Sequence, residues 1–256
     1  AAAGMATRWL EPDEARELCS WIDLPILGAV LPPDNGQLDA YRFSLALLAA
    51  AERMGATVRT GRVIGVERSD KRVTGVYVGE ELIPCTAAVF AVGPWMGEAA
   101  PWLETPVPIE PLKGQIVHVR TPGEAPRYGF ADHGDNYATP KASGLTYLGT
   151  TEEEVGFDVS PTREARDQIL AFALSASAVL GESEVLEQTA CLRPVSADEL
   201  PIISAVAGLS GAFVGGGHGR KGVMLAPVTG QILTQLVLGE PPAFDLTAFD
   251  LGRFAI

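Results

Sequence analysis

Cysteine and histidine are scarce in this sequence, and their scarcity excludes several kinds of site. The cysteines form no CxxC pattern, and the histidines are too far apart for a metal site with local spacing. We therefore predict no zinc site and no disulfide framework. The cysteines are Cys19, Cys85 and Cys191, and the histidines are His118, His133 and His218. Isolated cysteines are typical of a reducing compartment, and we therefore predict a cytoplasmic protein without a metal ion.

Long hydrophobic runs and a surplus of basic residues are also missing. Glycine, proline or charge interrupts the apolar stretches well short of the roughly 18 residues that a membrane span needs, and no basic-then-apolar leader opens the chain. Asp and Glu outnumber Lys and Arg by 32 to 19, which gives a formal net charge of −13 and an average field that repels polyanions. We therefore expect neither a membrane nor a nucleic acid as a partner.

Apolar residues are plentiful enough for a large core. The chain of 256 residues is 47% hydrophobic and shows no repeat of fixed period, which fits one large or two modest domains. Helical spacing of apolar residues between proline and glycine signals predicts four helices. They cover residues 11–20, 41–54, 161–180 and 223–238, and the segment 95–103 is also helix-like.

Short runs rich in Val and Ile predict strands between turn residues. A meander is predicted at 56–61 (ATVRTG), 62–69, 72–79 and 81–85, and a parallel strand buried on both faces at 86–92, before Gly93. An antiparallel sheet is predicted from 115–121, 128–133, 136–141 and 145–151, and further strands at 185–195 and 211–217. This order of helices and strands indicates a mixed fold of the α/β (α+β) class.

The clearest chemical pattern runs from Gly211 to Gly230 and consists of a strand, a glycine loop and a helix. Its GxGxxG match at Gly217–Gly222 is weak alone, because a dinucleotide fingerprint needs a second strand and an acidic residue after the helix, and here a proline-containing segment follows. The glycines still let a flat ligand approach the backbone, and the helix N-terminus offers free N–H groups to an electron-rich oxygen. A structural loop without a ligand is the alternative.

Arg193 is a candidate for binding a carboxylate. It follows a predicted strand and precedes Pro194, which restricts its fork of donors and suits a bidentate contact. An ion pair with Asp198 or Glu199 in the same turn is an equal alternative.

Together these stretches resemble the C-terminal flavin segment of the D-amino-acid oxidase, glycine oxidase and sarcosine oxidase (DAO) family. The resemblance covers about residues 20–240 and depends on the order of several motifs rather than on any one of them. The motifs are Gly36-Gln37-Leu38-Asp39, Ala91-Val92-Gly93-Pro94-Trp95, Pro111-Leu112-Lys113-Gly114-Gln115, Tyr137-Ala138-Thr139-Pro140, Gly149-Thr150-Thr151-Glu152, Arg193-Pro194 with Asp198 and Pro201-Ile202, Gly217-His218-Gly219 with Gly222, and Ala226-Pro227-Val228-Thr229-Gly230.

The resemblance implies roles for single residues. Arg193 matches the arginine that clamps the substrate carboxylate, and Tyr137 and Arg220 match residues that line the same pocket. The positions that match FAD contacts are Val63, Gly93, Gly217, His218, Gly219, Arg220, Lys221, Gly222, Val223 and Met224. Lys113 resembles an oxygen-activating lysine of some relatives, but it belongs to a strand motif of the family, which favours a structural role.

The implied architecture is a partial, Rossmann-like FAD-binding domain at 36–104 and 190–256, with an antiparallel-sheet substrate domain at 1–35 and 105–189. The GxGxxG strand-turn-helix unit that opens family members has no counterpart in this sequence. We therefore expect an incomplete chain: one that lacks its N-terminal segment through truncation or proteolysis, or one that a second polypeptide completes. A homo-oligomer is also open.

The implied reaction is removal of hydride from the amine-bearing carbon of a small amino acid or amine, transfer to FAD, and reoxidation by oxygen to give peroxide. Glycine, sarcosine, imino acids and larger D-amino acids stay open as substrates, because glycine-oxidase-like members often carry a bulkier residue than Gly219 before the arginine. The alternatives are a non-catalytic remnant of the fold, or a flavin dehydrogenase acting on a hydroxy acid or glycerol phosphate.

Overall fold

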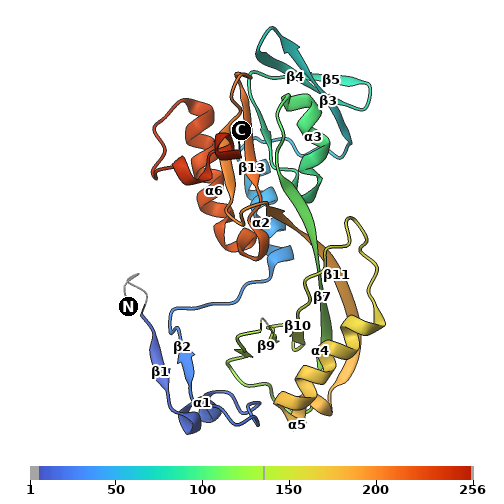
Figure 1. Cartoon of the computed structure of the whole chain (residues 1–256), viewed down its shortest axis with the longest axis vertical. Coiled ribbons are helices and arrows are strands. Elements are labelled where there is room, and N and C mark those ends of the chain that lie inside the picture. The colour runs from blue at the N-terminus through green and yellow to red at the C-terminus, as the bar shows by residue number, and fades with distance from the viewer. Residues whose placement is uncertain (1–5, 135, 255–256) are drawn as a thin grey trace. The chain divides into compact units, whose positions relative to one another are not determined.

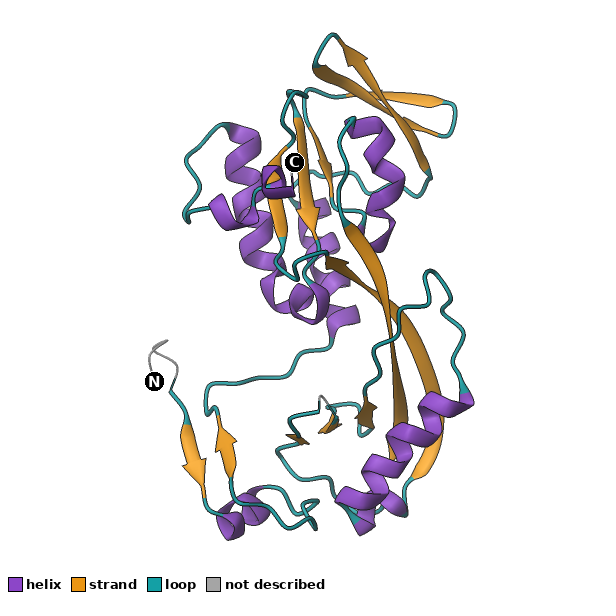
Figure 2. Cartoon of the chain, in the orientation of Figure 1, coloured by secondary structure: helices purple, strands orange, loops and turns teal. Residues whose placement is uncertain are grey.

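The computed structural model of the chain describes residues 6–134 and 136–254. The chain divides into two compact units, and both combine helices with strands (Figure 1 and Figure 2). Unit 1 comprises Ala1–Asp39, Lys113–Glu153 and Asp158–Cys191, and unit 2 comprises Ala40–Leu112, Glu154–Phe157 and Leu192–Ile256. The mixed fold predicted from the sequence is confirmed.

Unit 2 is built on a three-stranded sheet with the order β12-β13-β6. The strands are β6 (Ala88–Phe90), β12 (Ile202–Ala205) and β13 (Ala212–Gly216). β13 runs parallel to β6 and antiparallel to β12. Two helices, α3 (Met96–Leu103) and α6 (Gly222–Leu238), flank β13 (Figure 1).

Alternating side chains of β13 bury both faces of this sheet. Val214 packs into one cluster with Met96 and Leu103 of α3, whereas Phe213 packs into another with Leu233 of α6. All five are buried. The period of two along the strand therefore places the helices in separate layers, and each such side chain stabilises the unit by about 1.5–3 kcal/mol on burial.

A separate antiparallel meander of unit 2 consists of β3 (Val63–Ser69), β4 (Arg72–Val78) and β5 (Glu81–Pro84). The strand predicted at 56–61 is wrong, because those residues are exposed and outside any strand. β4 ends at Val78, which pairs with Val63, and the chain turns at Gly79, so this ladder offers no strand to pair with residues 56–61.

Most of the antiparallel sheet predicted from the sequence lies in unit 1, whereas residues 109–112 and 192–196 of its two longest strands belong to unit 2. Its strand order is β11-β7-β10-β9-β8, and β7, β10, β9 and β8 pair antiparallel. The strands are β7 (Ile109–Arg120), β8 (Phe130–Ala131), β9 (Tyr137–Pro140), β10 (Thr146–Gly149) and β11 (Glu184–Ser196). The helices α4 (Arg163–Ala176) and α5 (Ala178–Gly181) follow, and Val117, Leu148 and Ile169 share the core.

The remaining elements of unit 1 precede residue 40. They are β1 (Arg8–Leu10), which pairs antiparallel with β2 (Ala29–Leu31), and the short helix α1 (Pro12–Leu18) between them. Buried Leu10 and Trp21 add this segment to the core of the antiparallel sheet. The described part of unit 2 ends in two short 3-10 helices, η3 (Thr247–Phe249) and η4 (Leu251–Phe254).

Two elements of unit 2 leave apolar surface uncovered. The helix α2 (Ala40–Arg53) has no buried residue, and Leu45, Leu47 and Leu48 are 47–50% exposed. The strand predicted to be buried on both faces is wrong in this respect: β6 is a short edge strand, and its Val89 is 43% exposed. Within the described residues, β6 has a sheet neighbour on one side only, so its other edge is unpaired.

Candidate functional site

Two glycine turns of unit 2 lie at the same end of its sheet. β6 leads to Gly93 and β13 leads to Gly217, and since these strands are parallel their carboxyl ends coincide. Both glycines have positive φ, 60° at Gly93 and 75° at Gly217. Residues with a Cβ rarely adopt this left-handed backbone conformation. A Cβ at Gly93 would have no neighbouring heavy atom within 4 Å. Open α/β sheets bind ligands at this edge, and the space over Gly93 allows a flat group to approach the backbone.

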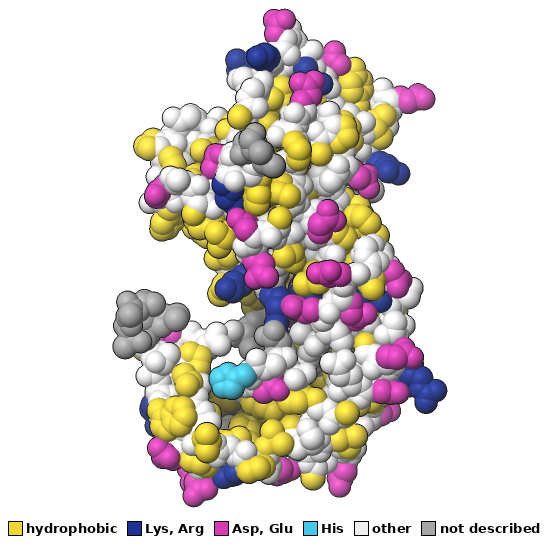
Figure 3. Space-filling view, viewed as in Figure 1, with side chains coloured by type: hydrophobic (Ala, Val, Ile, Leu, Met, Phe, Trp, Pro, Cys, Tyr) yellow, Lys and Arg dark blue, Asp and Glu magenta, His cyan; other side chains and the backbone are white. Residues whose placement is uncertain are grey.

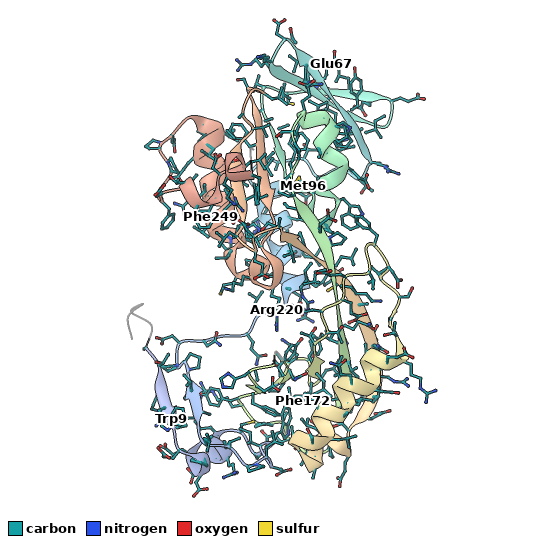
Figure 4. All side chains as sticks on the ribbon, in the orientation of Figure 1. Trp9, Glu67, Met96, Phe172, Arg220 and Phe249 are labelled. Atoms are coloured by element: carbon teal, nitrogen blue, oxygen red, sulfur yellow. The ribbon has the colours of Figure 1, made fainter. Side chains whose placement is uncertain are left out.

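The loop after β13 leads directly into helix α6. The 3-10 turn η2 (Gly219–Lys221) precedes α6, whose first turn has no side-chain cap and no acidic residue. No side chain caps the first N–H groups of this helix, and an uncapped helix N-terminus is suited to an electron-rich ligand atom. Arg220, labelled in Figure 4, is exposed on η2, and Val223 and Met224 of the first α6 turn are 42% and 68% exposed.

His218 is held by the helix that follows it. Its Nε2 lies 2.9 Å from Oγ1 of Thr229, a buried residue about two turns into the body of α6. Burial lowers the pKa of His218 from its ordinary value. A neutral imidazole bonded to a hydroxyl fixes the loop without adding a charge beside the glycines.

The end of β11 meets this loop. Val195 forms an antiparallel bridge with His218, and a Cβ at Gly217 would lie 3.0 Å from Cβ of Ser196. Arg193 is half-buried and lies two residues before Val195, on the same side of an extended strand. The structure of unit 2 thus brings the predicted carboxylate-binding arginine and the predicted glycine loop onto adjoining segments.

One of the two alternative partners proposed for Arg193, Asp198, binds another arginine, Arg253. Both carboxylate oxygens of Asp198 accept hydrogen bonds from Arg253, at 2.8 and 2.9 Å. This contact holds the pKa of Asp198 at about 2, and the hydrogen bond from Arg253 is the largest cause. Ser196, Thr229 and Arg253 were not singled out by sequence reasoning. Only Thr229 gave a signal, as part of the motif after the loop.

Val63 and Tyr137 lie in other sheets than the glycine turns. Val63 opens β3 of the meander, where it pairs with Val78. Tyr137 belongs to β9 of unit 1 and pairs with Gly149 of β10. A Cβ at Gly149 would lie 2.8 Å from the hydroxyl oxygen of Tyr137. The tyrosine ring therefore lies over this glycine, and a larger residue at position 149 would displace the ring.

Lys113 is buried in unit 1 and paired with acidic residues. Its Nζ lies 3.4 Å from Asp158 and 3.8 Å from Glu153, and its side chain is 1% exposed. Glu153 also accepts from Gln115 at 2.7 Å, which extends the contact into a polar network. These contacts support a structural role for the lysine.

The described residues contain no group of three or more His, Cys, Asp or Glu side chains arranged to hold a metal ion. Within the same ranges, each helix is too short or too polar to traverse a bilayer. Acidic side chains are scattered over the face drawn in Figure 3, as the formal charge of −13 predicts.

Comparisons with known proteins identify relatives of the whole chain. The sequence profile of the FAD dependent oxidoreductase (DAO) family matches residues 1–236. The chain is 31% identical over 252 residues to hydrogen cyanide synthase subunit HcnC of Pseudomonas aeruginosa, covering 96% of this chain and 60% of that protein. It is 33% identical over 184 residues to glycine oxidase of the same species, covering 72% of this chain and 50% of that protein.

Two solved structures share the fold. Glycine oxidase from Geobacillus kaustophilus superimposes with a TM-score of 0.92 at 27% identity, over 100% of this chain and 69% of that one. Iminodiacetate oxidase from Chelativorans sp. BNC1 gives 0.89 at 25% identity, over 98% and 68%. The chain therefore spans about half to two thirds of the length of the relatives that it matches.

Proposed function

We propose that this chain, which belongs to the FAD-dependent oxidoreductase (DAO) family, takes part in oxidation of the carbon–nitrogen bond of a small amino or imino acid. One observation carries the proposal: the loop after β13 and the strand end that bears Arg193 adjoin through the Val195–His218 bridge. An FAD-contacting loop and a carboxylate-binding arginine are the two parts that an amino-acid oxidase needs close together.

Unit 2 is the proposed FAD-binding unit. We place the flavin ring over the backbone at Gly93, where no heavy atom lies within 4 Å of the Cβ position, and beside the backbone at Gly217, whose Cβ position faces Ser196. The open N–H groups of α6 would face an electron-rich atom of the ring, and Val63 would contact the adenosine part. FAD, when bound, supplies the acceptor for the hydride, so the protein needs to supply position and electrostatics.

Three residues are proposed to bind the substrate. Arg193 of unit 2 would hold the substrate carboxylate through two parallel hydrogen bonds, which fixes the α-carbon, and Arg220 of unit 2 and Tyr137 of unit 1 are proposed as further substrate-binding residues. Glycine, sarcosine and imino acids are the substrates to test first, since glycine oxidases and an iminodiacetate oxidase are among the relatives. Larger D-amino acids follow.

The proposed FAD-binding unit has an uncovered side in the described residues. The relatives are longer than this chain, and α2 and β6 leave an apolar helix and an open sheet edge in unit 2. A strand-turn-helix segment that pairs with β6 would cover this edge and hold the FAD phosphates at its own helix N-terminus. Such a segment could belong to the same polypeptide or to a second one.

The visible absorption spectrum of the purified protein tests the proposal. The proposal is supported if the spectrum has oxidised-flavin bands and if these bands lose absorbance under anaerobic conditions when glycine, sarcosine or proline is added. A folded protein that is colourless after incubation with FAD and with its completing segment, once unbound FAD has been removed, would support a non-catalytic remnant. Bleaching by hydroxy acids but not by amino acids would refute the substrate class.

The carboxylate role has its own variant. Arg193→Leu removes a charge-assisted bidentate contact of about 1.5–3 kcal/mol and should raise KM for the amino acid roughly 10- to 150-fold. Arg59→Leu is the matched control, because Arg59 also forks onto a carboxylate, that of Glu81, but in the exposed meander region. An unchanged KM in Arg193→Leu would remove this residue from carboxylate binding.

A further inference from the structure

Arg253 uses its whole guanidinium near the end of unit 2. Its Nε and Nη2 donate to the two oxygens of Asp198 at 2.8 and 2.9 Å, Nη2 also donates to the carbonyl of Leu200 at 2.8 Å, and Nη1 donates to the carbonyl of Asp250 at 3.2 Å. The side chain is 14% exposed, and its Cζ lies 4.3 Å from the ring centroid of Phe254. A planar fork with this many acceptors is far more ordered than an ordinary surface ion pair.

The carboxylate that Arg253 binds closes the turn after β11. Oδ1 of Asp198 accepts from the backbone N–H of Leu200 at 3.2 Å and from the hydroxyl of Ser196 at 3.3 Å. The Ser196 hydroxyl also approaches the Leu200 carbonyl at 2.5 Å, and Glu199 takes a positive φ of 61°. This turn therefore holds a backbone conformation that costs free energy for a non-glycine residue, and the Arg253 fork offsets that cost.

The same turn is in contact with the glycine loop. Ser196 lies against Gly217, where a Cβ would be 3.0 Å from its Cβ and 3.4 Å from its backbone nitrogen. Val195, the preceding residue, bridges to His218. A displacement of the turn would thus move the loop on one side and the end of the strand that carries Arg193 on the other.

We infer that Arg253 is a positioning residue, which fixes through Asp198 and Ser196 both the glycine loop and the strand end of Arg193. The consequence for catalysis rests on the proposed function, whereas the mechanical coupling does not. No sequence motif pointed to Arg253, which lies 55 positions from Asp198.

The tail that carries Arg253 has its own anchors. The backbone N–H of Leu251 donates to Oγ of buried Ser204 at 3.1 Å, Leu251 is 7% exposed, and Phe254 packs against the core that contains α3. Removal of the guanidinium alone should therefore leave η4 in place. An effect of Arg253→Leu on the glycine loop can then be distinguished from a general detachment of the chain end.

The test compares Arg253→Leu with Arg59→Leu, which also removes a carboxylate fork but in the exposed meander region. In the FAD-loaded holoenzyme, Arg253→Leu should raise KM for the amino acid about tenfold or more, because the clamp and the loop lose their fixed geometry, with a smaller change in kcat. Arg59→Leu should leave both parameters unchanged. Arg253→Lys should restore part of the KM, because an ammonium keeps the charge but cannot form the fork.

Two further measurements do not depend on catalysis. Hydrogen exchange of the backbone amides at 217–222 should be faster in Arg253→Leu by about tenfold, the equivalent of roughly 1.4 kcal/mol in the opening equilibrium. In a double-mutant cycle, Arg253→Leu combined with Asp198→Asn should have no larger effect than Arg253→Leu alone, because the two side chains act as one unit.

The inference is overturned if Arg253→Leu lowers only the melting temperature and leaves both KM and exchange at 217–222 within twofold of the parent protein. Additive effects in the double-mutant cycle would also overturn it. If the parent protein oxidises no amino acid, the proposed function fails, and the exchange measurement still decides the positioning role.

Discussion

Comparing Gly93→Ala with Gly239→Ala tests whether the turn at Gly93 binds a cofactor or needs glycine only for its backbone conformation. Gly93 has φ 60° and no neighbouring heavy atom within 4 Å of the position that an added methyl group would take, and Gly239 at the end of α6 has φ 72° and is equally open. Alanine at either site carries the same backbone cost, about 1–2 kcal/mol for an L-residue in the left-handed region. The two variants should therefore lose similar stability in urea denaturation.

Their affinities for FAD should differ. If the flavin ring lies over Gly93, an added methyl group overpacks the contact at a cost of typically about 1–3 kcal/mol. That cost corresponds to a Kd that is roughly five- to 150-fold weaker. Gly239→Ala has no such contact to lose, so its affinity for FAD should stay at the parent value.

The assay is titration of the apoprotein with FAD, followed by flavin fluorescence, at one temperature and salt concentration for all three proteins. Equal FAD affinity in Gly93→Ala and Gly239→Ala, with both folded, would refute the placement of the ring over Gly93. Greater loss of stability in Gly93→Ala than in its control would show instead that the turn has a protein neighbour outside the described residues.

Three other predictions concern side-chain contacts. The pKa of Asp198 is held at about 2, below its ordinary value of 3.8, so the stabilising contribution of its carboxylate is present above pH 3.8 and is lost as the pH falls through 2. Between these two pH values, the unfolding free energy of Asp198→Asn should therefore change less with pH than that of the parent protein. Thr229→Val removes the hydroxyl that bonds His218 and should cost about 1 kcal/mol in urea denaturation, and no loss would show that water replaces it. Lys113→Met should leave kcat/KM for oxygen within about twofold, because the ammonium is already paired with Asp158 and Glu153; a much larger decrease would restore oxygen activation as its role.

Local sequence signals predicted much of the fold. The helices near 41–54, 161–180 and 223–238 appear where apolar spacing and breakers put them, and the antiparallel strands of unit 1 follow their period of two. Each of these confirmed helices and strands has a strong local sequence pattern and packs into a core of its own unit. The segment 56–61 has a strand-like composition but no partner strand, and composition alone does not reveal a missing partner.

The arrangement of the candidate site needed long-range pairing that no local pattern encodes. The glycine loop was predicted from its residues, but the bridge between Val195 and His218 follows from the topology of β11 and β13. The sequence predicts no strand at β12, because this strand is only four residues long and follows Pro201 directly. Arg253 gave no signal, because its role depends on a partner far away in the sequence.

A crystal structure of the FAD-loaded holoenzyme tests the central claim most directly. We predict electron density for the flavin ring in contact with the backbone at both Gly93 and Gly217, with the first turn of α6 pointing at it. Density for the ring elsewhere, with neither glycine turn in contact, would contradict the assignment of this edge of the unit 2 sheet as the cofactor site.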